Sequence, residues 1–312
     1  MRNRMTTLLL TVTVVVIGAV MLLVAMVGGV WWQQERIAYQ PPPVESPTAP
    51  SGARRVEYTA DDGQPLYGYR VDPAGTRRGV LVAFHGNADL ATWQIAWGQE
   101  LARRTGWCVL LAEYRGYGGL SGAPTYVGVQ RDARAAWRMA HVIASTTSIA
   151  SHDATPLIAL YGHSLGSAVA TELAAEVLGA HPESVTALLL QSPFTSARDM
   201  ARIVSTRPVQ VLWKLIARVH YDTRTRLDGI DVPVWISHGE RDWLVPVAMG
   251  REVFARARVP GELLVVRDAG HNDVGHVGGD AYWQWISNAL MVRGRNLWRS
   301  RSESKRRTEM SG

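Results

Sequence analysis

Hydrophobic positions occur first as one long run and later as short runs separated by helical patterns. The long run extends from Leu8 to Val30 and contains no charged residue. As an α-helix, its 23 residues would measure about 35 Å, more than the roughly 30 Å core of a bilayer. Trp31 and Trp32 follow where aromatic side chains meet lipid headgroups. We predict a membrane anchor at residues 1–33, retained because the apolar region of a cleaved signal peptide is usually shorter. The alternative is a signal peptide cleaved near Val27-Gly28-Gly29.

The charges that flank this run predict its orientation. Arg2 and Arg4 precede it, whereas Glu35 and Arg36 cancel each other after it. By the positive-inside rule, the N-terminus lies in the cytoplasm and the following domain on the non-cytoplasmic side, which is the periplasm in a bacterium. Residues 34–53 then form a proline-rich linker with too few apolar groups to pack.

Short apolar runs alternate with helical patterns across residues 54–292, which we expect to form one domain. The predicted hairpin strands are Val56–Thr59 and Leu66–Val71, and the later strands are Gly79–Phe84, Trp107–Ala112, Leu157–Tyr161, Thr186–Leu190, Val232–Ile236 and Leu263–Val266. The predicted helices are Ala91–Arg103, Val127–Ala144, one after Leu165 and a last one with Tyr282, Trp285, Ile286 and Ala289 on its apolar face. This alternation predicts a doubly wound, mostly parallel α/β sheet.

The stretch Leu157–Gly166 carries the strongest chemical signal. Its apolar strand ends in Gly162-His163-Ser164-Leu165-Gly166, and apolar residues then recur every four positions, as on one face of a helix. A serine between two glycines at a strand–turn–helix junction is a nucleophile-elbow pattern, since the tight turn leaves little room for neighbouring side chains. Ser164 is therefore the candidate nucleophile. The amide of Leu165, at the start of the helix, is a candidate oxyanion donor.

A serine nucleophile needs a base, and the base needs an orienting acid. After the elbow, the expected order is acid and then histidine. Asp242 follows a predicted strand and is the candidate acid, with Glu240 as the alternative. His271 follows the next strand and is the candidate base, with His276 as the alternative. No carboxylates or cysteines accompany these histidines at ligand spacing, so we expect neither a metal nor another cofactor.

The loop after the strand ending at Phe84 is the candidate second half of an oxyanion hole. Its backbone donor is assigned to Asn87, because serine hydrolases with an elbow supply an amide from this position. Alternatively, His85 and Asn87 only fix the loop through hydrogen bonds. Residues 194–228 are the expected cap, either as a surface helix or as a small apolar lid over an acyl pocket.

Composition and charge narrow the possible partners. The chain is 47% hydrophobic and 19% charged, which is typical of a folded protein. Its net charge of +6 comes from the ends, because the tail 293–312 holds seven basic and two acidic residues. We expect this tail to be disordered or to bind anionic lipid, and we expect no nucleic-acid partner. Cys108 lies in an apolar run and is expected to be a small core residue.

Six motifs occur in order along residues 54–290. They are HGNADL at 85–90, YRGYGG at 114–119, YGHSLGS at 161–167, LQSPFTS at 190–196, SHGERDWLVP at 237–246 and AGHND at 269–273. Together they resemble a subgroup of the α/β-hydrolase superfamily that includes eukaryotic protein depalmitoylases and several single-pass membrane hydrolases. The resemblance implies an α/β-hydrolase fold and a triad of Ser164, Asp242 and His271. The chain departs from the depalmitoylases at its start, where a hydrophobic span replaces their cysteine-rich, lipidated segment.

The combined prediction is a membrane-anchored serine hydrolase that cleaves carboxylic ester or thioester bonds through an acyl-enzyme. Its substrate would be a small-molecule or lipid-like acyl compound. A serine peptidase or amidase is one alternative, since the same triad serves both reactions. A non-catalytic binding protein with the hydrolase fold is another. The natural substrate, its acyl length and the oligomeric state stay open.

Overall fold

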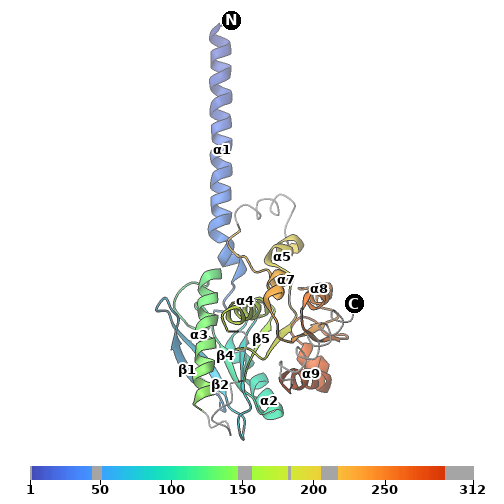
Figure 1. The fold of residues 1–312 in the computed structure, drawn as a ribbon. Coiled ribbons are helices and arrows are strands. Elements are labelled where there is room, and N and C mark those ends of the chain that lie inside the picture. Colours follow the sequence, from blue (N-terminus) through green and yellow to red (C-terminus); the bar gives the residue numbers. More distant parts are fainter. Residues whose placement is uncertain (1, 44–50, 147–156, 182–183, 205–216, 292–312) are drawn as a thin grey trace, which may run out of the picture.

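One eight-stranded sheet forms the framework of the molecule, with strand order β1-β2-β4-β3-β5-β6-β7-β8 (Figure 1). The computed structural model describes residues 2–43, 51–146, 157–181, 184–204 and 217–291. The strands are β1 (Arg54–Thr59), β2 (Pro65–Val71), β3 (Val80–Phe84), β4 (Cys108–Ala112), β5 (Ile158–His163), β6 (Ala187–Gln191), β7 (Val234–Gly239) and β8 (Pro260–Val266).

Strand direction agrees with the prediction from the hydrophobic pattern. β2 pairs antiparallel with both β1 and β4, and the pairs from β4 to β8 are parallel. All five residues of β3 are buried because helices cover both faces of the parallel part, so an unbroken apolar run encodes this strand. The predicted doubly wound, mostly parallel α/β sheet is confirmed.

The residues of β3 alternate between two hydrophobic clusters, one on each face of the sheet. Val80, Val82 and Phe84 belong to the cluster that also contains buried residues of α3 (Tyr126–Ser145), α4 (Leu165–Ala180) and α8 (Val247–Arg256). Leu81 and Ala83 belong to the cluster on the other face, which also contains buried residues of α2 (Ile95–Thr105) and α9 (Val274–Met291). The helix predicted from residue 91 begins as the 3-10 turn η1 (Ala91–Gln94). Cys108 is fully buried within β4, and burial raises the pKa of its thiol to about 12.

The predicted cap region contains α5 (Ala197–Val204), α7 (Thr223–Arg226) and the 3-10 turn η2 (Leu227–Gly229). Figure 1 shows α5 and α7 on the side of the domain from which α1 (Arg2–Ala38) projects. Most of the helix predicted within the cap falls on residues 205–216, outside the described residues. The predicted tail 293–312 lies outside them as well. A lid function for the cap therefore stays a prediction.

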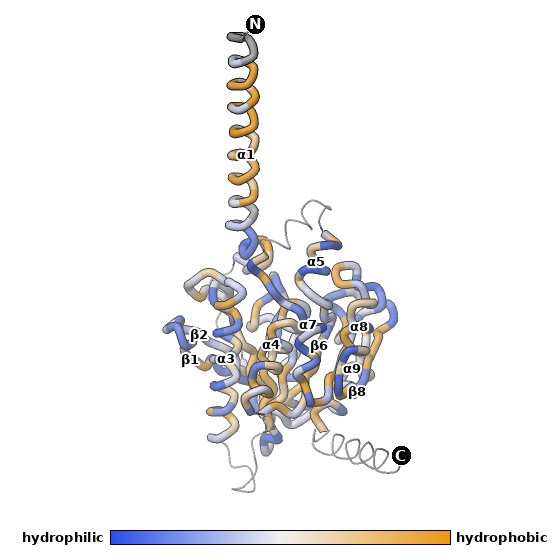
Figure 2. The backbone as a smooth tube through the Cα atoms, turned by 45° about the horizontal axis from the view of Figure 1, so that its top comes forward, coloured by the Kyte–Doolittle hydropathy of each residue, from blue (hydrophilic) through white to orange (hydrophobic). Residues whose placement is uncertain are grey.

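Helix α1 projects from the domain, and Figure 2 shows apolar residues along most of its length. Its segment Thr6–Ala38 is long and apolar enough to cross a membrane, and no part of its most apolar stretch of 18 residues is buried. The helix continues past residue 33, where the sequence predicts the linker to begin. Gln34 and Tyr39 are buried against the domain, so the last turn of α1 is part of the domain's packing.

Candidate active site

Ser164 lies between β5 and α4 with φ 53° and ψ −115°, a backbone conformation that non-glycine residues rarely adopt. A Cβ atom at Gly162 would overlap the backbone of Gly166, and a Cβ at Gly166 would overlap the carbonyl of Phe84. Both flanking glycines are thus required by close backbone approach. Strain of this kind costs about 1–3 kcal/mol and persists where the surrounding structure holds it.

Backbone hydrogen bonds hold the strained serine in place. The amide of Ser164 donates to the carbonyl of Gln191, at 2.9 Å, on the neighbouring strand β6. The carbonyl of Ser164 accepts from the amide of Ser167 at 2.9 Å and from its hydroxyl at 2.5 Å. Leu165 is the first residue of α4, so its amide lies at the positive end of the helix dipole.

The structure brings the candidate acid and base together. Nδ1 of His271 donates to Oδ2 of Asp242 at 2.7 Å, and both residues are buried. The other carboxylate oxygen accepts from the amides of Leu244 and Val245 at 3.0 and 2.8 Å. Glu240 and His276, the alternatives from the sequence, are both exposed. The buried pair is therefore Asp242 with His271.

A second histidine, which the sequence prediction did not include, stabilises this carboxylate. Nε2 of His238 lies 3.3 Å from Oδ2 of Asp242 and 2.9 Å from the carbonyl of Val245. Burial alone would raise the pKa of Asp242, but hydrogen bonds from His238 and His271 hold it well below its usual range. The carboxylate is therefore charged at neutral pH. The sequence could have suggested a role for His238 only through its position four residues before Asp242.

His163 connects the loop of His271 to the elbow, and sequence reasoning gave it no role either. Its Nε2 donates to the carbonyl of His271 at 3.1 Å, and the two imidazole rings lie 5.1 Å apart. Ser192 donates to the same carbonyl at 3.4 Å. Burial and the neighbouring His271 lower the pKa of His163 to about 4, so its ring is neutral at pH 7. Within the described residues, no hydrogen bond joins the Ser164 hydroxyl to His271.

Asn87 follows β3, and its side chain has partners at both ends. Oδ1 accepts from the amide of Gln40 and from the hydroxyl of Tyr117, both at 2.8 Å. Nδ2 donates to the carbonyl of Ala38 at 2.9 Å. The backbone amide of Asn87 donates to none of the described residues. The side chain thus fixes the loop while the amide can still receive a ligand.

His85 fixes the same loop from inside the domain. Its Nε2 lies 2.7 Å from Oε1 of Glu113, and its carbonyl accepts from the hydroxyl of Tyr114 at 3.0 Å. Burial alone would lower the pKa of His85, but the Glu113 carboxylate raises it above its ordinary value. These contacts match the loop-fixing alternative for His85 and Asn87, and they are compatible with an oxyanion role for the Asn87 amide.

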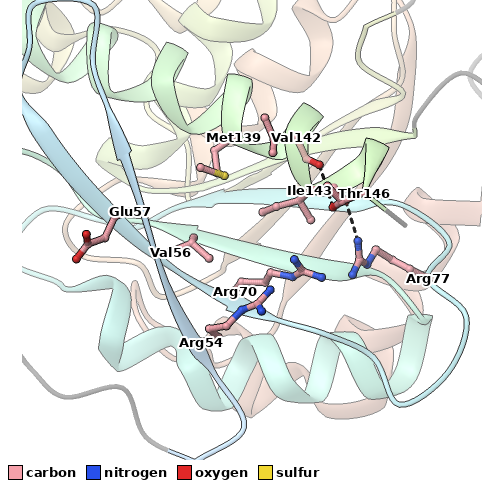
Figure 3. A pocket seen from close by; sticks show the side chains of 9 residues that line it. All are labelled: Arg54, Val56, Glu57, Arg70, Arg77, Met139, Val142, Ile143 and Thr146. Carbon is pink, nitrogen blue, oxygen red and sulfur yellow. Dashed lines mark hydrogen bonds between the residues drawn. The ribbon is translucent and has the colours of Figure 1, made fainter. Parts of the chain in front are cut away.

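An open cavity of about 630 Å³ lies elsewhere, where β1 and β2 meet the end of α3. Figure 3 shows Arg54, Arg70 and Arg77 lining it together with Met139 and Ile143. Arg70 and Arg77 both pair with Asp72 at 2.8 Å, so this one carboxylate balances one of their two positive charges. In the described part of the chain, no cluster of three His, Cys, Asp or Glu side chains could hold a metal ion.

Known proteins place the chain in a family. A family model described as the alpha/beta hydrolase fold matches residues 79–217. An uncharacterized protein of Mycobacterium tuberculosis is 32% identical over 238 residues, covering 75% of this chain and 77% of that protein. Alpha/beta hydrolase domain-containing protein 17B of Homo sapiens is 30% identical over 195 residues, which cover 62% of this chain and 61% of that protein.

The solved structure of an esterase from Pyrococcus furiosus superimposes with a TM-score of 0.59 at 22% identity, covering 81% of this chain and 97% of the esterase. At this identity, the superposition establishes a common fold. The order of the strands, the strained serine after β5 and the family model that matches residues 79–217 all agree with that fold. The chain therefore belongs to the α/β-hydrolase fold family.

Proposed function

We propose that this protein is a serine hydrolase that cleaves carboxylic ester or thioester bonds, with Ser164 as nucleophile, His271 as base and Asp242 as orienting acid. The observation that carries the proposal is the strained backbone of Ser164, at φ 53°, held at the carboxyl edge of the sheet. The buried hydrogen bond between Asp242 and His271 lies at the same edge, after β7 and β8. Ligands of open α/β sheets bind at this edge.

In the first half-reaction, Nε2 of His271 removes the proton from Oγ of Ser164 as that oxygen attacks the acyl carbonyl. The carbonyl electron pair moves onto oxygen, and the amides of Leu165 and Asn87 donate to the resulting oxyanion. Asp242 keeps the Nδ1 proton of His271 in place and stabilises the imidazolium. The tetrahedral intermediate then expels the alcohol or thiol, which takes the proton from Nε2.

In the second half-reaction, water replaces the leaving group. His271 removes a proton from the water as it attacks the acyl-enzyme carbonyl, and the same two amides hold the second oxyanion. Collapse of this intermediate returns the proton to Oγ of Ser164 and releases the carboxylic acid. The cycle consumes one water and needs no cofactor.

We further propose that α1 anchors this hydrolase in a membrane, with the N-terminus cytoplasmic and the domain on the opposite side. Support comes from the apolar segment of α1, which is long enough to cross a bilayer, and from the arginines that precede it. The acyl substrate is a small or lipid-like molecule that reaches the carboxyl edge of the sheet.

A fluorophosphonate probe, which labels activated serines covalently, tests the proposal. Wild-type protein should be labelled, Ser164→Ala should not, and Ser196→Ala serves as a control because Ser196 is a buried serine bonded to Asp199. Absence of wild-type labelling would refute a catalytic role. Rates on p-nitrophenyl esters and aminoacyl anilides then distinguish an esterase from an amidase, and faster anilide cleavage would contradict the proposed bond type.

A further inference from the structure

The last turn of α1 contacts the loop that carries Asn87. We propose that Ala38–Gln40 is a positioning element for the oxyanion hole, which makes the end of the anchor helix part of the active site. The inference rests on the proposed function, because it assumes that the Asn87 amide binds the oxyanion.

The direct contacts all pass through the Asn87 side chain. Its Nδ2 donates to Ala38 at 2.9 Å, and its Oδ1 accepts from Gln40 and Tyr117 at 2.8 Å each. One of these three bonds is donated by the nitrogen of the side-chain amide, and the other two are accepted by its oxygen. Because both ends are engaged, rotation of the side chain would break all three. Oδ1 also accepts from the amide of Ala88 at 3.1 Å, a residue with a φ of 52°. The contacts therefore restrain the backbone immediately after the proposed donor.

The anchor end is itself held on the domain, so it can act as a support. Gln34 is buried, and its Oε1 accepts from the amide of Arg218 at 2.8 Å. Glu35 pairs with the guanidinium of Arg218 at 2.9 Å and accepts from the amide of Tyr126, the first residue of α3, at 3.3 Å. The hydroxyl of Tyr39 lies 3.0 Å from that of Tyr221, and both are buried. These contacts link α1 and the residue that follows it to the start of α3 and to residues 218–221 of the predicted cap.

An oxyanion donor contributes only if it lies within hydrogen-bond distance of the atom where charge develops. A misplacement of roughly 1 Å can cost about 100-fold in rate. Since the donor engages the oxyanion mainly in the transition state, loosening the Asn87 loop should lower kcat and leave KM nearly unchanged. A merely structural contact would lower the melting temperature without this separation between kcat and KM.

The experiment removes one contact of the anchor with Asn87 in the full-length protein. Gln40→Pro deletes the backbone N–H that donates to Oδ1, whereas Gln40→Ala keeps it. On a short soluble p-nitrophenyl ester, Gln40→Pro should lower kcat about tenfold at unchanged KM. Gln40→Ala keeps the N–H and should therefore have the same kcat as the wild type. Thermal unfolding of each variant reports whether the fold is intact.

A double-mutant cycle with Asn87→Ala shows whether the effect passes through the Asn87 side chain. We expect Gln40→Pro to add no further loss of kcat in the Asn87→Ala background. Wild-type kcat in Gln40→Pro, or an equal loss in both backgrounds, would overturn the inference while leaving the hydrolase proposal intact. A wild-type protein without Ser164-dependent hydrolysis would overturn both.

Discussion

The depressed pKa of His163 should make the folded protein less stable in mild acid. Its pKa is about 4 in the folded state, compared with about 6.5 for an ordinary histidine in the unfolded chain. Between these pH values, the unfolded state binds a proton that the folded state does not. The free energy of unfolding therefore falls as pH decreases from about 6.5 to 4, and the loss is complete below pH 4.

The size of this effect follows from the difference between the two pKa values. Each pKa unit corresponds to about 1.4 kcal/mol, so His163 alone contributes a loss of at most about 3 kcal/mol. This is an upper value because the side chain is partly exposed and water screens its charge. The stabilisation is fully present at pH 7, above both pKa values.

Chemical denaturation of the wild type and His163→Gln between pH 4 and 7 measures this contribution. The glutamine amide can donate to the His271 carbonyl as Nε2 of His163 does, but it does not titrate. We expect the wild type to lose stability relative to the variant as pH falls through this window. Parallel stability curves for the two proteins would refute the assignment of a depressed pKa to His163.

Three further predictions concern the site and the core. Asp242→Asn should lower kcat about 10³- to 10⁴-fold in ester hydrolysis, while Glu240→Gln, at an exposed position, should leave kcat unchanged. If the two variants had the same kcat, Asp242 would be excluded as the acid. Gly166→Ala should destabilise the protein by about 1–3 kcal/mol in chemical denaturation, because its Cβ overlaps neighbouring backbone. Gly179→Ala, in the same helix with open space around it, should be neutral or stabilising by up to about 1 kcal/mol, and similar losses in both variants would contradict the steric argument. Cys108 should react with thiol reagents only on unfolding, as followed by mass spectrometry, and rapid labelling of the native protein would contradict its burial.

The hydrophobic pattern was sufficient to predict most of the sheet because the parallel strands β3 to β7 are buried on both faces. Residues such as Val80–Phe84 form an unbroken apolar run that ends at a loop rich in glycine and polar residues. The elbow was predictable for a similar local reason. Gly162, Ser164 and Gly166 are close in sequence, and their spacing encodes the tight turn. Such features depend on neighbours along the chain.

Contacts between distant parts of the chain were harder to predict. Asp242 and His271 could be chosen because each follows a strand, but for His238 the sequence offered only its position four residues before Asp242, which does not indicate a shared hydrogen bond. The sequence analysis also did not predict that the end of α1 packs against the domain. Gln34 and Tyr39 stand in a polar, proline-bordered stretch that resembles a linker, and their partners Arg218 and Tyr221 lie far away in the sequence.

Helix α1 runs without a break from its apolar segment to the residues that pack on the domain, and this has a mechanical consequence. No glycine or proline occurs between Val30 and Ala38 that could serve as a joint. Trp32 at the proposed lipid boundary and the buried Gln34 are only about 3 Å apart along the helix axis. Helix α1 and the domain would then tilt together as one rigid body. Since helices tilt to match bilayer thickness, a thinner or thicker membrane would rotate the whole hydrolase relative to the lipid surface.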